Sequence, residues 1–188
     1  MLKQLAEYEK FVEINGFSKS GIGDAKALLE SIRKDLPEGV EAQLFNADLV
    51  ATWQHLCFAA LNALQAFKSR RNLSKTLATE TVLYASAQRQ IKKAIEFIGV
   101  KTDSKAVAVL LLGADVDSVE AGLLVVTKRL KVEPDENVLA LFENKFNKIK
   151  SVFDVSEAEL EAVSVKFNTE KALVDLIIER VALLSTRL

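Results

Sequence analysis

His55 and Cys57 are the residues best suited to nucleophilic chemistry, and each is the only one of its type in the 188 residues. A catalytic pair needs the base beside the nucleophile. Because the two residues lie two positions apart in a predicted helix, their side chains differ in direction by about 200° and point apart. Cys57 also falls on the apolar face of that helix, where a buried, inert thiol is expected. The sequence therefore predicts no Cys–His dyad.

Phosphate-binding loops and metal sites are poorly supported as well. Gly16 and Gly21 have the first spacing of a Walker loop, but Ile22 and Gly23 stand where Lys and Ser/Thr are needed. A dinucleotide fingerprint starting at Gly21 fails because Lys26 replaces its third glycine. One histidine and one cysteine leave only carboxylates as metal ligands and exclude an intramolecular disulfide. We therefore expect no enzyme activity, no cofactor and no metal.

Basic residues form two short clusters although the net charge is −1, from 25 basic and 26 acidic residues. This balance argues against a protein that coats nucleic acid by bulk charge. It leaves room for local phosphate binding by residues that share a turn or a helix face, with solvated faces as the alternative. The first cluster is Lys68, Arg70, Arg71 and Lys75, and the second is Arg89, Lys92 and Lys93.

Two helix faces are candidates for contacts with a partner. In the predicted helix 53–70, a face of small residues permits close approach of a ligand or another helix, with packing inside the same domain as the alternative. In the predicted helix 168–184, apolar residues span an arc of about 220°, whereas one packed face needs about 100° or somewhat more. This excess predicts either docking to a partner or insertion into the domain centre. The small-residue face consists of His55, Ala59, Asn62 and Ala66.

Hydrophobic periodicity and turn residues predict the elements that position these residues. Their order predicts a single α/β domain of the α+β type, with a mixed or antiparallel sheet covered by helices and a helical C-terminal third. Strands are expected at 5–14, 40–45, 81–85 and 106–112, the last buried on both faces. Helices are expected at 24–34, 53–70, 88–98, 117–130, 135–149, 156–163 and 168–184.

Membrane and export segments are not expected. The longest apolar run, 106–112, is far shorter than the roughly 20 residues that a spanning helix needs. Residues 1–10 are too polar for the apolar stretch of a signal peptide. Together with the low cysteine content, these features predict a cytoplasmic protein, or also a nuclear one in a eukaryote.

Several short motifs occur in a recognisable order along the chain. They lie at 45–50, 55–61, 66–74, 83–86, 89–99, 155–161 and 176–183. Among them are Arg71-Asn72-Leu73-Ser74 and Leu83-Tyr84-Ala85-Ser86. Each is weakly specific alone, but together they resemble the Cgi/TPRKB family over about residues 40–112 and 152–188. Residues 1–40 and 115–150 match less clearly. We therefore expect one Cgi/TPRKB-like domain over 1–188, with a helical embellishment at 115–150.

The resemblance implies a non-catalytic subunit of the KEOPS (EKC) complex, which installs threonylcarbamoyl on the adenosine beside the anticodon of tRNAs. It implies two partners, the small PRPK-type kinase/ATPase subunit and the single-stranded CCA end of tRNA. A protein-only scaffold and a small-molecule-binding α/β domain are the alternatives. For tRNA we predict that the phosphates are contacted by Arg71, Lys75, Arg89, Lys92 and Lys93. The bases of the single-stranded end are predicted to rest on the small-residue face, near His55 and Asn62. For the kinase we predict contacts through Val174, Ile178, Val181 and Leu184.

Overall fold

The central element of the protein is an antiparallel sheet. The computed structural model describes residues 1–19, 21–164 and 168–186, and in these residues the sheet has four strands in the order β1-β2-β4-β3. All three strand pairs are antiparallel, which confirms the α+β class and decides between the two predicted kinds of sheet. The strands are β1 (Leu2–Leu5), β2 (Lys10–Phe17), β3 (Glu41–Asn46) and β4 (Val107–Gly113).

β4 lies inside the sheet, and all of its residues are buried. Successive side chains of a strand point to opposite faces of the sheet. Alternate residues of β4 accordingly enter two different apolar cores. Val107, Val109 and Leu111 belong to one core, and Ala108, Leu110 and Leu112 belong to the other. The prediction of a strand buried on both faces is confirmed.

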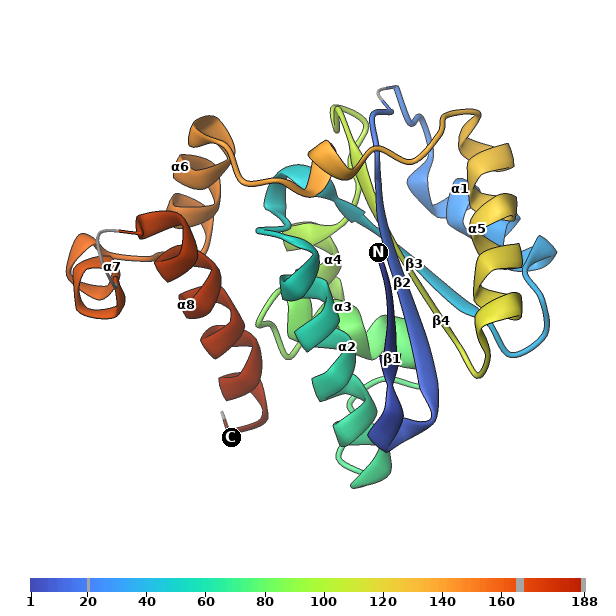
Figure 1. Cartoon of the computed structure of the whole chain (residues 1–188), viewed down its shortest axis with the longest axis horizontal. Coiled ribbons are helices and arrows are strands. Elements are labelled where there is room, and N and C mark those ends of the chain that lie inside the picture. Colours follow the sequence, from blue (N-terminus) through green and yellow to red (C-terminus); the bar gives the residue numbers. More distant parts are fainter. Residues whose placement is uncertain (20, 165–167, 187–188) are drawn as a thin grey trace.

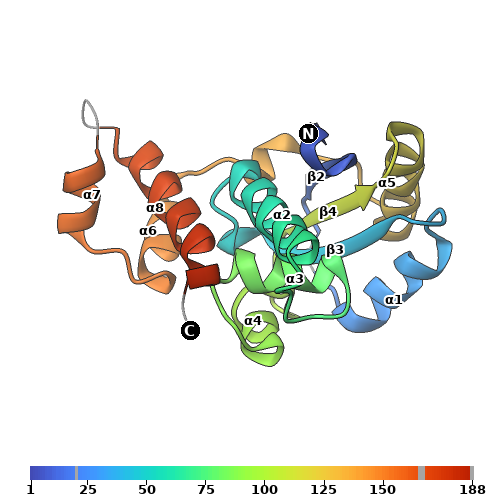
Figure 2. The same cartoon turned by 90° about the horizontal axis from the view of Figure 1, so that it is seen from below.

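Helices cover both faces of the sheet (Figure 1, Figure 2). One face carries α1 (Ala25–Asp35) and α5 (Val116–Leu130), and the other carries α2 (Trp53–Lys68), α3 (Leu77–Ala85) and α4 (Ile91–Ile98). Asp24 starts α1 because its carboxylate accepts hydrogen bonds from the amides of Lys26 (2.9 Å) and Ala27 (3.0 Å). Within the described residues, no helix has the length and apolar character needed to cross a membrane.

The last third of the chain is helical, as predicted, and its final three α-helices lie beside α2, away from the sheet (Figure 1, Figure 2). It contains α6 (Glu143–Val152), α7 (Glu157–Val163) and α8 (Thr169–Leu183), which share a separate apolar core. Ser156 and Glu159 start α7 with a capping box, and Asn168 caps α8. Residues 115–150 hold α5, the 3-10 turn η3 (Glu136–Leu139) and most of α6. Their description as an embellishment stays a prediction.

Three predicted elements are wrong in type or extent. Residues 81–85 belong to helix α3 and do not form a strand. The strand expected at 5–14 is the hairpin of β1 and β2, interrupted by the turn η1 (Ala6–Tyr8), after which Glu9 adopts the left-handed conformation with φ 51°. The helix expected at 135–149 is divided into η3 and α6. Two further 3-10 turns are η2 (Ala47–Leu49) and η4 (Leu184–Thr186).

Candidate functional site

The turn between α2 and α3 carries the first basic cluster and is held by a buried carboxylate. Glu80 is 1% exposed and accepts hydrogen bonds from the amides of Leu73 (3.0 and 3.2 Å) and Ser74 (2.7 Å). A buried carboxylate requires such partners. Arg71 and Lys75 are exposed on the same turn. Glu80 therefore ties the turn to α3 and fixes the backbone from which these two cations extend.

The second basic cluster follows the other end of α3, where the chain enters α4. The five predicted phosphate-binding residues, which we call the basic surface, are all exposed. Its two halves are separated by α3, whose nine residues span about 13 Å. Within the described chain the one ion pair on this surface joins Lys92 Nζ and Glu96 Oε1 at 4.0 Å. The structure thus leaves most of these charges available to a partner. The basic surface consists of Arg71, Lys75, Arg89, Lys92 and Lys93.

His55 lies inside the protein, which contradicts its predicted contact with tRNA. Its side chain is 0% exposed. Nδ1 accepts a hydrogen bond from the Ala51 amide (3.3 Å), so Nε2 carries the hydrogen and donates to the Ala85 carbonyl (2.8 Å). The Phe153 ring meets the imidazole edge-on, with 5.6 Å between centroids. Burial, aided by nearby Lys145, lowers the pKa of His55 to about 4, so the ring is neutral and structural.

Most of the small-residue face of α2 is also internal. Ala59 and Ala66 are buried, and α2 packs against both α3 and α8. Asn62 is half-buried, and its Nδ2 donates to the Phe58 carbonyl one turn earlier (2.8 Å). The predicted base contact of His55 is therefore contradicted by its burial, whereas Asn62 stays partly accessible and its contact with tRNA stays a prediction. Packing within the same domain, the alternative interpretation, is what the structure has.

The predicted kinase-binding face of α8 is only partly available. Val181 and Leu184 are 0% and 3% exposed and belong to the core that α8 shares with α2. Their prediction as partner contacts is therefore contradicted, because both are already covered by the protein itself. Val174 and Ile178 are half-buried, and Leu183 is 42% exposed. The wide apolar arc of α8 is used mainly for insertion between α2 and the helices α6 and α7.

Cys57 offers no reactive group. Its side chain is buried, and burial raises the pKa of the thiol, which keeps the sulfur protonated at neutral pH. His55 cannot act as its base because both ring nitrogens are engaged by Ala51 and Ala85. Across residues 1–19, 21–164 and 168–186, no group of three His, Cys, Asp or Glu side chains could hold a metal ion.

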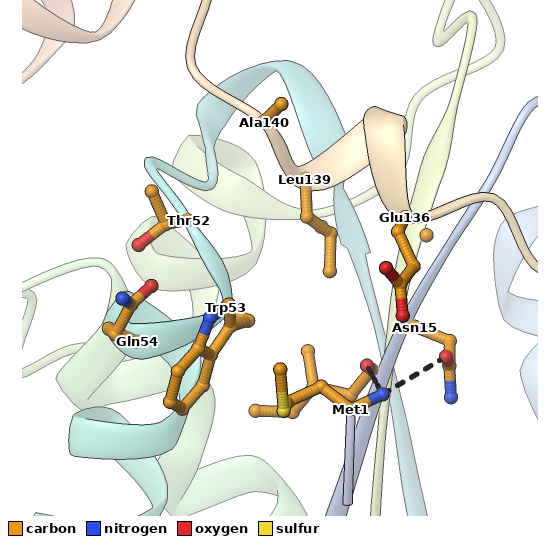
Figure 3. Close-up of a pocket in the computed structure, with 10 residues that line it drawn as sticks. Met1, Asn15, Thr52, Trp53, Gln54, Glu136, Leu139 and Ala140 are labelled. Atoms are coloured by element: carbon orange, nitrogen blue, oxygen red, sulfur yellow. Dashed lines mark hydrogen bonds between the residues drawn. The ribbon is translucent and has the colours of Figure 1, made fainter.

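A cavity of about 290 Å³ lies where β2, the start of α2 and η3 meet (Figure 3). We call it the η3 cavity. Gly16 permits the close crossing of η3 over β2, since a Cβ there would lie 2.5 Å from Val138 Cβ. This cavity was not predicted from the sequence, because the segments that line it are far apart in the chain. The lining residues are Met1, Ile14, Asn15, Gly16, Thr52, Trp53, Gln54, Glu136, Leu139 and Ala140.

A buried lysine holds η3 in place over the cavity. Lys145 is 6% exposed, and its Nζ donates hydrogen bonds to the carbonyls of Val138 (3.0 Å) and Ala140 (3.2 Å). Burial lowers the pKa of Lys145 to about 8, and the negative charge of Asp48 opposes this shift. The ammonium group therefore satisfies the free carbonyls at the end of η3, as cations do at helix C-termini.

The family model described as "Kinase binding protein CGI-121" matches residues 20–185. A curated protein of Methanocaldococcus jannaschii, named "Regulatory protein Cgi121", is 31% identical over 117 residues, which are 62% of this chain and 72% of that protein. The match to the family model covers most of the described fold, from α1 to α8. The chain therefore belongs to the CGI-121 family.

Proposed function

We propose that this protein is a non-catalytic regulatory subunit that binds a small PRPK-type kinase/ATPase and the CCA end of tRNA within a KEOPS complex, in support of threonylcarbamoyladenosine formation. Membership of a family described as kinase binding is the observation that carries the proposal. The relative's name as a regulatory protein supports a non-catalytic role. Action on tRNA places the protein in the cytoplasm, or also in the nucleus of a eukaryote.

For the kinase, the support comes from the apolar side chains that α8 leaves uncovered. Val174 and Ile178 lie one turn apart on α8, so they share one face. Leu183 adds a partly exposed side chain near the end of the same helix. Apolar groups at the rim of a packed helix are suited to complete a protein interface. Ile178 is therefore the central residue of the proposed kinase contact.

Replacing Ile178 by glutamate should abolish co-elution with the kinase subunit on gel filtration. The new charge would be buried at the interface without a partner, which weakens binding strongly. Because Ile178 is only half-buried in the free protein, the circular dichroism spectrum should stay native. Glu161→Lys on α7, an exposed position, is the control and should co-elute normally. A folded Ile178→Glu protein that still co-elutes would exclude this interface.

For tRNA, the support comes from the basic surface, whose side chains are exposed on both sides of α3. Exposed apolar residues accompany its second half, since Ile91 and Ile95 on α4 are 41% and 50% exposed. Cations beside apolar groups suit a single-stranded end, because phosphates contact the charges and bases contact the apolar side chains. These exposed groups support tRNA contacts around α3 and α4, away from His55.

Reversing the charge at Arg89 and Lys93 should weaken tRNA binding and reduce its dependence on salt. Each phosphate contact to a single strand contributes about 0.7 to the slope of log K against log [salt], so loss of two contacts lowers the slope by about 1.4. Gel-shift titrations at several salt concentrations measure this. The control is Lys128→Glu with Arg129→Glu on α5, across the sheet. The proposal would be contradicted if the Arg89/Lys93 variant and the control variant bound tRNA with the same affinity and the same salt dependence.

A further inference from the structure

One face of the sheet is only partly covered by helices. In the described part of the chain, α1 packs on β3 and α5 packs on β4 and β2, whereas the extensive contacts of the edge strand β1 are with β2. Neighbouring strands lie about 4.8 Å apart and packed helices about 8–10 Å apart, so helices in a layer are about two strands apart. The place next to α5 therefore falls over β1, and no helix of the described residues fills it.

A hollow of about 600 Å³ lies at this place, between α5 and the strands β1 and β2. We call it the α5 groove. Leu124 on α5 is 71% exposed, which makes it the most exposed large apolar side chain of the described residues. A single exposed leucine is common, but Leu124 lines a hollow together with other apolar side chains, which is typical of a protein-binding surface. The lining includes Leu2, Glu13, Asp117, Glu120, Ala121 and Leu124.

The α5 side of the groove is acidic. Asp117 and Glu120 lie three residues apart on α5, so they share one face, and both are exposed. Within the described chain, the one ion pair of α5 joins Arg129 to Asp35, which leaves the two carboxylates without a cation. Lys128, the first cation along α5, follows one turn after Leu124 and does not line the groove. The carboxylates are therefore available to a partner.

The strand side of the groove adds a carboxylate that is nearly buried. Glu13 is 7% exposed, and its Oε1 accepts hydrogen bonds from Asn15 Nδ2 (2.6 Å) and the Met1 amino group (2.9 Å). In the described residues these bonds reach Oε1 only, so Oε2 can still accept one from a partner. Lys3 on β1 points to the opposite face, where its Nζ lies 5.2 Å from the centre of the Trp53 ring. The lysine therefore does not neutralise the groove.

We propose that the α5 groove binds an amphipathic helix of a partner protein. Its apolar face packs on Leu2 and Leu124, and its flanking lysines or arginines pair with the carboxylates of the groove. The acidic wall repels nucleic acid, and two copies of this chain related by a twofold axis would bring the same carboxylates together. The groove lies on α5, opposite α2, α3, α4 and α8 (Figure 1), so the proposal is independent of the proposed kinase and tRNA contacts.

A synthetic peptide of leucine and lysine tests the proposal on the intact, isotope-labelled protein. About 18 residues give five helical turns, with leucine recurring every three or four positions. Titration followed by NMR should show saturable shifts confined to β1, β2 and α5. A peptide with glutamate in place of lysine should not bind, because it carries the charge of the groove. A leucine–lysine peptide of strictly alternating sequence tests pairing of a strand with the free edge of β1, and it should bind more weakly.

Leu124→Ser should weaken binding of the leucine–lysine helix about tenfold or more, because it removes the main apolar contact without changing the charge. The variant should fold normally, since Leu124 is largely exposed. Phe142→Ser is the matched control, because Phe142 is 53% exposed at the start of α6 and does not line the groove. The control should bind the peptide as the unaltered protein does.

Asp117→Lys combined with Glu120→Lys should weaken the same binding and remove its dependence on salt. Glu161→Lys combined with Glu170→Lys changes the net charge equally at exposed positions on α7 and α8, and should bind normally. The proposal is overturned if no peptide saturates, if the acidic or the alternating peptide binds equally well, or if Leu124→Ser leaves the affinity unchanged. A dimer of the protein that Leu124→Ser dissociates would instead assign the groove to a second copy.

Discussion

Replacing Val181 by glutamate is expected to lower the free energy of unfolding by about 4 kcal/mol or more. Val181 is fully buried in the core that joins α8 to α2. Burial of such a side chain contributes roughly 1.5–3 kcal/mol, and a carboxylate without a partner in the core costs several kcal/mol more. Small domains are stable by only about 5–15 kcal/mol. Urea denaturation followed by circular dichroism measures the loss.

The matched comparison is Ile178→Glu on the same helix, one turn before Val181. Because Ile178 is half-buried, its variant should lose at most a small part of this stability. The pair separates the two uses of the apolar arc of α8, internal packing and partner contact. A Val181→Glu protein that unfolds at the same urea concentration as the unaltered chain would mean that α8 does not pack on α2.

The sequence predicted the elements whose apolar pattern is long or unbroken. β4 was evident because its residues form one apolar run, and α2 because its apolar residues recur every three or four positions. α3 was missed for a physical reason. Residues 80–85 are all buried, so no polar face marks a helical period, and Thr81 and Val82 are branched at Cβ. Packing in the folded protein makes this segment a helix although its local residues favour a strand.

The candidate site could be predicted only where residues keep their usual environment. The exposed cations of the basic surface lie at the surface, as long charged side chains usually do. Glu80 and Lys145 break this rule, because each is buried to hold a backbone segment. Nothing in their local sequence distinguishes them from surface charges. The η3 cavity was equally hidden, since β2, α2 and η3 are far apart in the sequence.

The wide apolar arc of α8 shows how an ambiguous pattern is resolved by packing. One face of the helix enters the core shared with α2, through Val181, and another enters the core of the C-terminal helices, through Leu173 and Ile177. A helix between two layers needs an arc wider than a helix that covers one layer. The sequence therefore left insertion and docking as equal alternatives. The structure assigns most of the arc to insertion and leaves Ile178 at its edge.

Acidification from about pH 6.5 to about pH 4 is expected to cost the protein up to roughly 3 kcal/mol of stability through His55 alone. Its pKa is about 4 in the folded protein, against 6.5 in the unfolded chain. Between these values the unfolded state binds the proton and the folded state does not, so stability falls as the pH falls. Above pH 6.5 both states are neutral, and this contribution is complete and constant.

His55→Gln isolates this contribution, because glutamine retains a donor for the Ala85 carbonyl but does not titrate. The variant should be less stable at pH 7 by about 1–3 kcal/mol, since the Ala51 amide loses its acceptor. The stability difference between the two proteins should then shrink as the pH falls to 4. Lys145 stays charged throughout this range, and carboxylates such as Asp115 and Glu159 titrate alike in both proteins, so neither affects the difference. Parallel stability curves from pH 7 to pH 4 would mean that His55 is not held as a buried, neutral histidine.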